Sequence, residues 1–264
     1  MAVFASNLSF LSTFFLLLVL ISPAKSRLDA HYYDQTCPQA EKIILDTVQN
    51  ASMHDPKVPA RILRMFFHDC FIRSGGPYWN VLKGRKDGRV SKANDTINLP
   101  APTFNVTQLI QSFAKRGLGV KDMVALSGGH TLGFSHCSSF EARLGNFSSV
   151  HAIDTSMNRE FAVKLRKKCP KSNKDHNAGE FLDSTAATFD NDYYKRLKEG
   201  KGVFGSDQAL FGDYRTRWIV ESFAKDQSLF FREFATSMVK LGNVEVIENE
   251  EVRRKCRVVN SYSE

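Results

Sequence analysis

The sequence lacks the paired spacings of a zinc site and any apolar run long enough to cross a bilayer. No Cys-x-x-Cys or His-x-x-x-His pair occurs, which argues against a zinc centre built from histidine and cysteine. The main apolar run, residues 8–21, is shorter than the roughly 20 residues that a spanning helix needs. There is also no internal repeat, low-complexity tract or long linker, so we expect one large domain or two lobes.

The apolar run near the amino terminus is typical of a secretory signal peptide. It is followed by Pro23 and by the small-x-small triplet Ala24-Lys25-Ser26, which predicts cleavage after Ser26. No Lys or Arg precedes it, so the terminal amine alone supplies the usual positive charge. We expect residues 1–26 to be removed and residues 27–264 to be secreted to the extracellular space, the cell wall or the vacuole.

The charge balance limits the partners that this chain can have. The formal net charge is +8, and loss of Lys25 with the signal peptide makes it +7. A basic secreted protein is attracted to anionic matrices such as acidic wall polysaccharide. The basic residues are spread along the sequence without a recognition motif, so we expect no nucleic-acid partner. We also expect no membrane partner, and we expect a monomer. Four glycosylation sequons remain after residues 1–26 are removed, and any that is used must lie at the surface: Asn50, Asn94, Asn105 and Asn146.

The periodicity of apolar residues predicts a mainly α fold. Helical spacing occurs at residues 39–53, 60–70, 107–115, 120–131, 156–168 and 191–199, and again in the Phe-rich stretch 214–241. Residues 75–102 are rich in Gly, Pro, Asn and charge, which indicates a loop. The 21 Phe residues, against 7 Tyr and 2 Trp, fit a helical protein that buries many rings, either around a flat apolar ligand or simply in its core.

Two histidines stand in unusual surroundings. Arg64, Phe67 and His68 are spaced i, i+3 and i+4, so a helix places all three on one face. His130 follows Gly128 and Gly129 at the end of an apolar helical run, and paired glycines let a flat ligand or a neighbouring backbone approach. Taken singly, each histidine is more often structural than functional.

Six strings of residues, in a fixed order, resemble the signature set of the class III secretory plant peroxidases. The resemblance covers essentially all of the chain after the signal peptide. The strings are Gln35-Thr-Cys-Pro38, Arg64-Met-Phe-Phe-His-Asp-Cys-Phe71, Asn98-Leu-Pro-Ala-Pro102, Leu126-Ser-Gly-Gly-His-Thr131, Phe189-Asp-Asn-Asp-Tyr-Tyr194 and Ser206-Asp-Gln208.

This resemblance implies a two-lobed, mainly α haem peroxidase fold that encloses haem b. His130 resembles the axial ligand of the haem iron. Asp207 resembles the carboxylate that accepts a hydrogen bond from the other ring nitrogen and makes the imidazole more basic.

The resemblance also implies the reaction. His68 resembles the acid and base that takes a proton from hydrogen peroxide and returns it to the departing oxygen. Arg64 resembles the group that stabilises negative charge on that oxygen, and Phe67 lies beside the cofactor. Pro100 matches the proline at the edge where small phenolic donors bind.

Two calcium ions are implied as well. A polar loop of ordinary turn residues is the alternative for the proximal site, and the stretch 183–190 is one residue shorter than the family pattern. The residues that resemble ligands of the proximal ion are Thr131, Asp183, Thr185, Thr188 and Asp190.

The chain departs from the family after the first histidine. A block of several dozen residues is missing between Ser74 and Gly75, so part of the distal lobe is absent. Asp69 and the carbonyl of Ile72 match the start of the distal calcium site, but its other ligands are gone, and we expect no ion there. The asparagine that hydrogen-bonds the distal histidine is missing too, which predicts weaker activity, by about 10 to 100-fold.

Five cysteines remain, an odd number for a secreted protein. The resemblance implies one bridge, between Cys137 and Cys169. Cys37, Cys70 and Cys256 match cysteines whose partners lie in the missing block, and cross-pairing among them would need new geometry. The alternative to an active enzyme is therefore an impaired secreted glycoprotein of peroxidase ancestry that binds acidic wall polysaccharide.

Overall fold

The computed structural model describes residues 28–55, 58, 76–90, 92, 94, 99–145, 147–170, 175, 177–244, 251–255 and 258–260. The predicted signal peptide, the predicted helix 60–70 and the junction at Ser74 and Gly75 all lie outside these residues.

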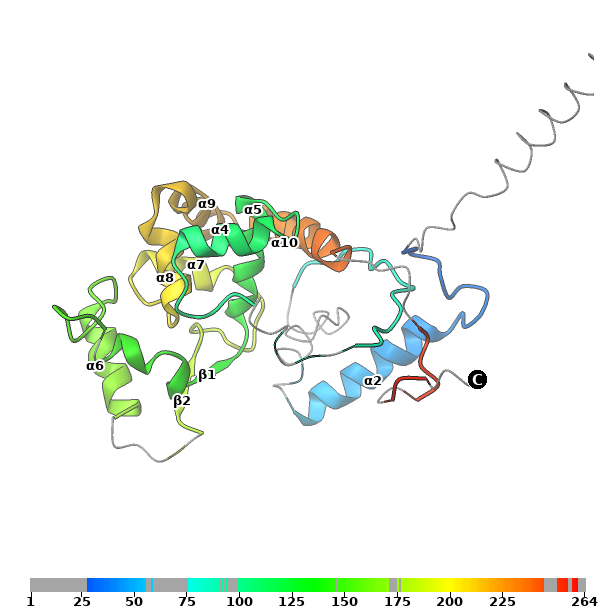
Figure 1. The fold of residues 1–264 in the computed structure, drawn as a ribbon, viewed down its shortest axis with the longest axis horizontal. Helices are drawn as coiled ribbons and strands as arrows, with labels where there is room; N and C mark the ends of the chain where they lie inside the picture. Colours follow the sequence, from blue (N-terminus) through cyan, green and yellow to red (C-terminus); the bar gives the residue numbers. More distant parts are fainter. Residues whose placement is uncertain are drawn as a thin grey trace, which may run out of the picture.

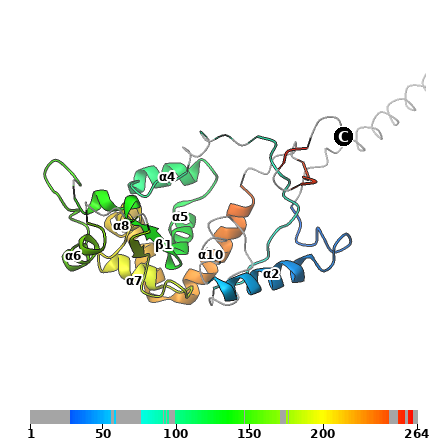
Figure 2. The same ribbon diagram turned by 90° about the horizontal axis from the view of Figure 1, so that it is seen from below.

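The described chain is mainly α, as the sequence predicts, with a helical body that Figures 1 and 2 show from two sides. Its α-helices are α2 (Ala40–His54), α4 (Val106–Ala114), α5 (Val120–Ser127), α6 (Arg159–Lys168), α7 (Asp192–Lys198), α8 (Gly205–Gly212), α9 (Tyr214–Lys225) and α10 (Gln227–Gly242). Short 3-10 turns are η3 (Gly128–Thr131), η4 (Cys137–Ser139) and η5 (Glu141–Arg143).

The structure adds two details to the helical prediction. The stretch 214–241, predicted to be helical, is two helices, because Asp226 between them is extended and its carboxylate accepts the backbone N–H of Leu229 at 2.9 Å, which starts α10. Helix α8 was not predicted, since its glycines at both ends obscure the pattern.

The aromatic residues form the main core, between α5, α7, α9 and α10. The rings of Phe189, Tyr194, Phe223, Phe230 and Phe234 are almost fully buried, and neighbouring centroids lie 4.8–5.9 Å apart. In the described body, therefore, many of the Phe residues fill core rather than surround a ligand.

A second apolar cluster surrounds α6 and holds the disulfide. Phe140, Phe161 and Leu165 are its largest buried members. Cys137 and Cys169 are bonded to each other, as the family pairing implies, and tie η4 to the end of α6. Strands β1 (Phe134–His136) and β2 (Gly179–Phe181) pair antiparallel beside it, with Ser135 opposite Glu180.

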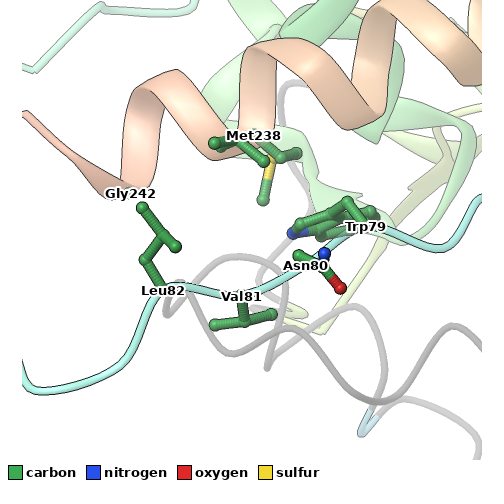
Figure 3. Close-up of a pocket in the computed structure, with 7 residues that line it drawn as sticks. Trp79, Asn80, Val81, Leu82, Met238 and Gly242 are labelled. Carbon is green, nitrogen blue, oxygen red and sulfur yellow. The ribbon is translucent and has the colours of Figure 1, made fainter. Parts of the chain in front are cut away.

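The amino-terminal part of the chain packs less deeply than the helical body. No residue of α2 is buried, and Figure 1 shows it apart from the other helices. The irregular segment 76–90 joins the two parts, as the loop prediction requires. Trp79 anchors it, because its ring lies edge-on to Phe234 of α10 at 5.9 Å. Figure 3 shows Trp79, Val81 and Leu82 lining a small pocket with Met238.

Among the described residues, no helix combines the length and apolar character that a membrane crossing requires.

Candidate active site

His130 lies just after the carboxyl end of helix α5. Helix α5 is followed directly by η3, which carries His130 and the fully buried Thr131. The imidazole is 41% exposed, so solvent reaches part of the ring. The ring of Phe204 lies edge-on to it, with centroids 5.3 Å apart.

Asp207 holds the imidazole of His130. Its Oδ1 lies 2.9 Å from Nδ1 of His130, and the carboxylate is only 4% exposed. The contact joins residues 77 positions apart in the sequence. Because a carboxylate accepts, Nδ1 carries the proton and the lone pair of the ring lies on Nε2, the arrangement found in histidines that bind metals.

Tyr193 completes this group, a role that the sequence analysis did not predict. Its hydroxyl donates to the same Oδ1 of Asp207 at 2.9 Å. Burial raises the pKa of Tyr193 well above its ordinary value, and the charge of Asp207 raises it further, so the phenol stays protonated and donates. Asp207 also accepts the backbone N–H of Phe204 at 3.4 Å, which fixes the carboxylate at the start of α8.

The packing around Gly128 explains why a glycine stands at this position before His130. A Cβ there would lie 2.3 Å from Oη of Tyr194 and 2.5 Å from Cε2 of Phe230. Tyr194 donates its hydroxyl to the carbonyl of Val124 at 2.9 Å, so its ring cannot simply move away. At Gly128 the close approach is thus made by core side chains, which neither alternative of the sequence analysis named.

Thr131, next to His130, reaches a cluster of oxygen atoms. Its hydroxyl donates to Oδ2 of Asp183 at 2.6 Å and lies 3.3 Å from Oδ1 of Asp190. The hydroxyl of Thr185 is 3.1 Å from the same atom of Asp190. Four of the five residues that resemble proximal calcium ligands therefore share one hydrogen-bond network.

The fifth residue and one neighbour differ from expectation. Thr188 is exposed, and its backbone N–H donates to the carbonyl of Thr185 at 2.6 Å. Asp192, which the sequence did not single out, receives two hydrogen bonds from Ser184 and donates its N–H to Asp190 at 2.8 Å.

Burial raises the pKa of Asp183 to about 6, although hydrogen bonds from Thr131 and Thr185 oppose the rise; the charges of Asp190 and Asp192 add to it. Clustered carboxylates of this kind suit a hard cation. Among the described residues, however, no group of three or more His, Cys, Asp or Glu is placed to hold a metal, so the hydroxyl oxygens are needed as well.

The other predicted site residues divide into two groups. Pro100 is described and exposed, on the chain that leads into α4. The residues of the opposite side lie outside the described part of the chain: Arg64, Phe67, His68, Asp69, Cys70 and Ile72.

Comparison with known proteins places this site in a family. A family model described as peroxidase matches residues 72–226. Peroxidase 66 of Arabidopsis thaliana is 56% identical over 310 aligned positions, which cover 93% of this chain and 96% of the relative. Peroxidase 64 of the same plant is 39% identical over 316 positions, covering 96% of this chain and 99% of the relative.

The mainly α body and the histidine held by a buried carboxylate fit a haem peroxidase. With the matches above, the chain belongs to the class III secretory plant peroxidases. Both alignments are longer than the 264-residue chain itself, so these relatives carry positions that it lacks. That those positions fall between Ser74 and Gly75 stays a prediction.

The described half of the site fits the haem that this family implies. Nδ1 of His130 is committed to Asp207, which leaves Nε2 as the nitrogen that would bind iron. The Asp207 carboxylate is itself held by Tyr193 and Phe204, so the ring orientation is fixed before any cofactor binds.

Proposed function

We propose that this chain reduces hydrogen peroxide at the expense of small phenolic donors, with haem b held by His130. The family supports peroxidase activity; the phenolic donor and the individual residue roles are our proposal. The observation that carries it is the buried contact from Asp207 to Nδ1 of His130. In each turnover one peroxide becomes two waters, and two phenols each lose one electron and one proton.

Haem would supply the redox chemistry, and the side chains would position the reactants and move protons. His68 accepts a proton from the attacking peroxide oxygen and returns it to the departing one, so that water leaves. Arg64 stabilises the negative charge that develops on the departing oxygen. Phe67 excludes water beside them, and Pro100 borders the entry of the phenol.

The cluster at Thr131 is proposed to bind one calcium ion. Carboxylate and hydroxyl oxygens of Thr131, Asp183, Thr185 and Asp190 are the hard donors that calcium prefers. Thr131 follows His130 directly on η3, so an ion there would also fix the position of the imidazole. The absent part of the distal site leads us to expect no second ion.

The test is an assay of the full secreted chain, supplied with haem, for peroxide-dependent oxidation of a phenolic dye. We expect His68→Ala to lower turnover by about 100-fold or more, since general acid and base catalysis contributes that much. His151→Ala, at an exposed histidine, is the matched control and should retain activity. Turnover that is equal in the two variants would overturn the roles proposed here.

The alternative is an impaired glycoprotein that binds acidic wall polysaccharide. It predicts no turnover in the haem-loaded chain but salt-sensitive retention on a pectic matrix. Asn105, the asparagine of one described sequon, is exposed. Its side-chain Oδ1 also caps α4 by accepting the backbone N–H of Gln108 at 3.0 Å. The complete His130 and Asp207 contact favours the enzyme.

A further inference from the structure

Two neighbouring helices carry a clear excess of basic over acidic side chains. Helix α6 carries five basic side chains and one acidic one, and α7 carries three basic and one acidic. The two helices therefore hold +6 of the formal +8 of the chain.

Contacts between the two helices bring these charges into one region. The guanidinium of Arg196 in α7 lies 5.3 Å from the centre of the Phe161 ring in α6, and Nζ of Lys164 lies 5.9 Å from the same ring. The backbone N–H of Asn158, which caps α6, donates to the carbonyl of Gly200 just after α7 at 2.8 Å.

Some of these cations have structural roles. Lys168 and Lys164 approach Oε2 of the buried Glu180, at 2.8 Å and 3.5 Å. Arg166 and Lys167 are exposed, and neither forms an ion pair with a described residue.

The helix dipole does not account for this surplus. Arg166, Lys167 and Lys168 all lie in the last turn of α6, where the dipole amounts to only about half a negative charge. Lys164 and Lys168, one turn apart, repel each other, which costs stability unless an anion lies nearby. Glu180 compensates for one charge, and the remaining cations face solvent.

We propose that the cationic surface formed by the exposed side chains of Lys164, Arg166, Lys167 and Lys168 of α6 is a docking site for a linear polyuronate. Exposed ammonium and guanidinium groups on one helix suit carboxylates repeated along a polymer. A secretory plant protein meets such polymers in the wall matrix. The inference is independent of catalysis, because none of these side chains belongs to the His130 site.

The test compares two double variants that lose the same charge. Arg166→Gln/Lys167→Gln changes the proposed surface and leaves both partners of Glu180 in place. Lys115→Gln/Lys225→Gln removes two exposed cations at the ends of α4 and α9. Lys225, like the pair on α6, lies in a last turn, so the two variants also share the loss of dipole stabilisation.

Binding of the full chain to immobilised polygalacturonate would be measured between about 20 and 200 mM NaCl. We expect wild-type binding that salt weakens, an apparent affinity about tenfold lower for the α6 variant, and less than about a twofold change for the control. Peroxide turnover should be the same in all three proteins.

Three results would overturn the proposal. Equal weakening in both variants would show that overall charge, and no particular surface, causes retention. Equal retention on a neutral glucan would remove the role of carboxylates. Tighter binding to duplex DNA at the same salt concentration would assign the surface to a different polyanion.

Discussion

At the scale of single residues, Asp207 decides which nitrogen of His130 can bind a metal. Its buried carboxylate accepts from Nδ1 and is held by the hydroxyl of Tyr193. Replacement by asparagine keeps the shape but removes the charge.

We therefore expect Asp207→Asn to lower peroxide turnover by about 10 to 100-fold and to shift the absorption spectrum of the bound haem. Tyr193→Phe, which removes one donor to the same carboxylate, should have a smaller effect in both measurements. A spectrum and a turnover rate unchanged in Asp207→Asn would show that the contact does not tune the site.

The neighbours of Gly128 leave no room for a side chain at this position. Because a Cβ would come within 2.3 Å of Tyr194 and 2.5 Å of Phe230, Gly128→Ala should lower the free energy of unfolding by about 1–3 kcal/mol. Gly212→Ala is the matched control, since nothing lies within 4 Å of its Cβ position. Urea denaturation of the two variants measures the difference, and equal midpoints would refute the explanation.

The sequence identified His130 and Asp207 through the family pattern, but it could not identify Tyr193 as their partner. The three residues meet only after α5, α7 and α8 have packed together, and no local spacing signals that contact. The sequence also could not show that side chains of Tyr194 and Phe230 pack against Gly128, because both come from later helices.

At the scale of elements, the loop between β2 and α7 is tied to η3 through Thr131. If calcium binds among Thr131, Asp183, Thr185 and Asp190, a calcium chelator should lower the melting temperature. The expected shift is roughly 5–10 °C, because an ion at 100 times its Kd adds about 2.7 kcal/mol. Thermal unfolding followed by circular dichroism measures it.

The Asp183→Asn variant should lose most of this response, whereas Asp175→Asn, at an exposed carboxylate, should keep it. A wild-type melting temperature that ignores the chelator would mean that the cluster is held by hydrogen bonds alone.

A buried ion pair joins η5 to the chain before α6. Nε of Arg143 lies 2.7 Å from Oδ2 of Asp154, and both side chains are about 5% exposed. Burial tends to raise the pKa of Asp154, but hydrogen bonds from Ser156 and Arg143 and the charge of Arg143 outweigh it, so the pKa lies below its usual 3.8.

A lowered pKa means that this pair stabilises the fold above about pH 3.8 and that the contribution is lost as the pH falls through the folded value. Asp154→Asn should therefore cost about 3–5 kcal/mol at pH 7 and progressively less in stronger acid. Urea midpoints across pH measure this. Asp46→Asn, which breaks an exposed pair with Lys42, should cost about 0.5 kcal/mol or less at every pH.

Helices with a clear apolar stripe were predictable from sequence, and helix ends set by capping were less so. Helices α4, α5, α6 and α7 lie within one to three residues of expectation, apart from the last turn of the 120–131 prediction, which is η3. The division of 214–241 at Asp226 depends on a side-chain hydrogen bond that periodicity does not register.

At the scale of the whole molecule, the chain has fewer cysteines for crosslinks than the family pattern implies. One of the bridges that the family implies is present, between Cys137 and Cys169. Cys37 is free and exposed, while Cys70 and Cys256 lie outside the described residues. Each absent bridge would remove about 2–4 kcal/mol, so we expect a protein less stable than its longer relatives.

The family, the mainly α fold and the pairing of His130 with Asp207 were thus accessible from sequence, because short strings of residues identify them. The basic run 164–168 is visible in the sequence, but its approach to α7 is not, since the contacts of Phe161 with Arg196 and of Asn158 with Gly200 form only in the folded chain.

The central claim is that His130 holds the haem iron, and the most direct measurement is the Soret absorption of the purified, haem-supplied chain. We predict a Soret band in the wild-type protein that is lost in His130→Ala, with the helical circular dichroism unchanged. An identical band in the variant, or a folded wild-type chain that takes up no haem, would contradict the claim.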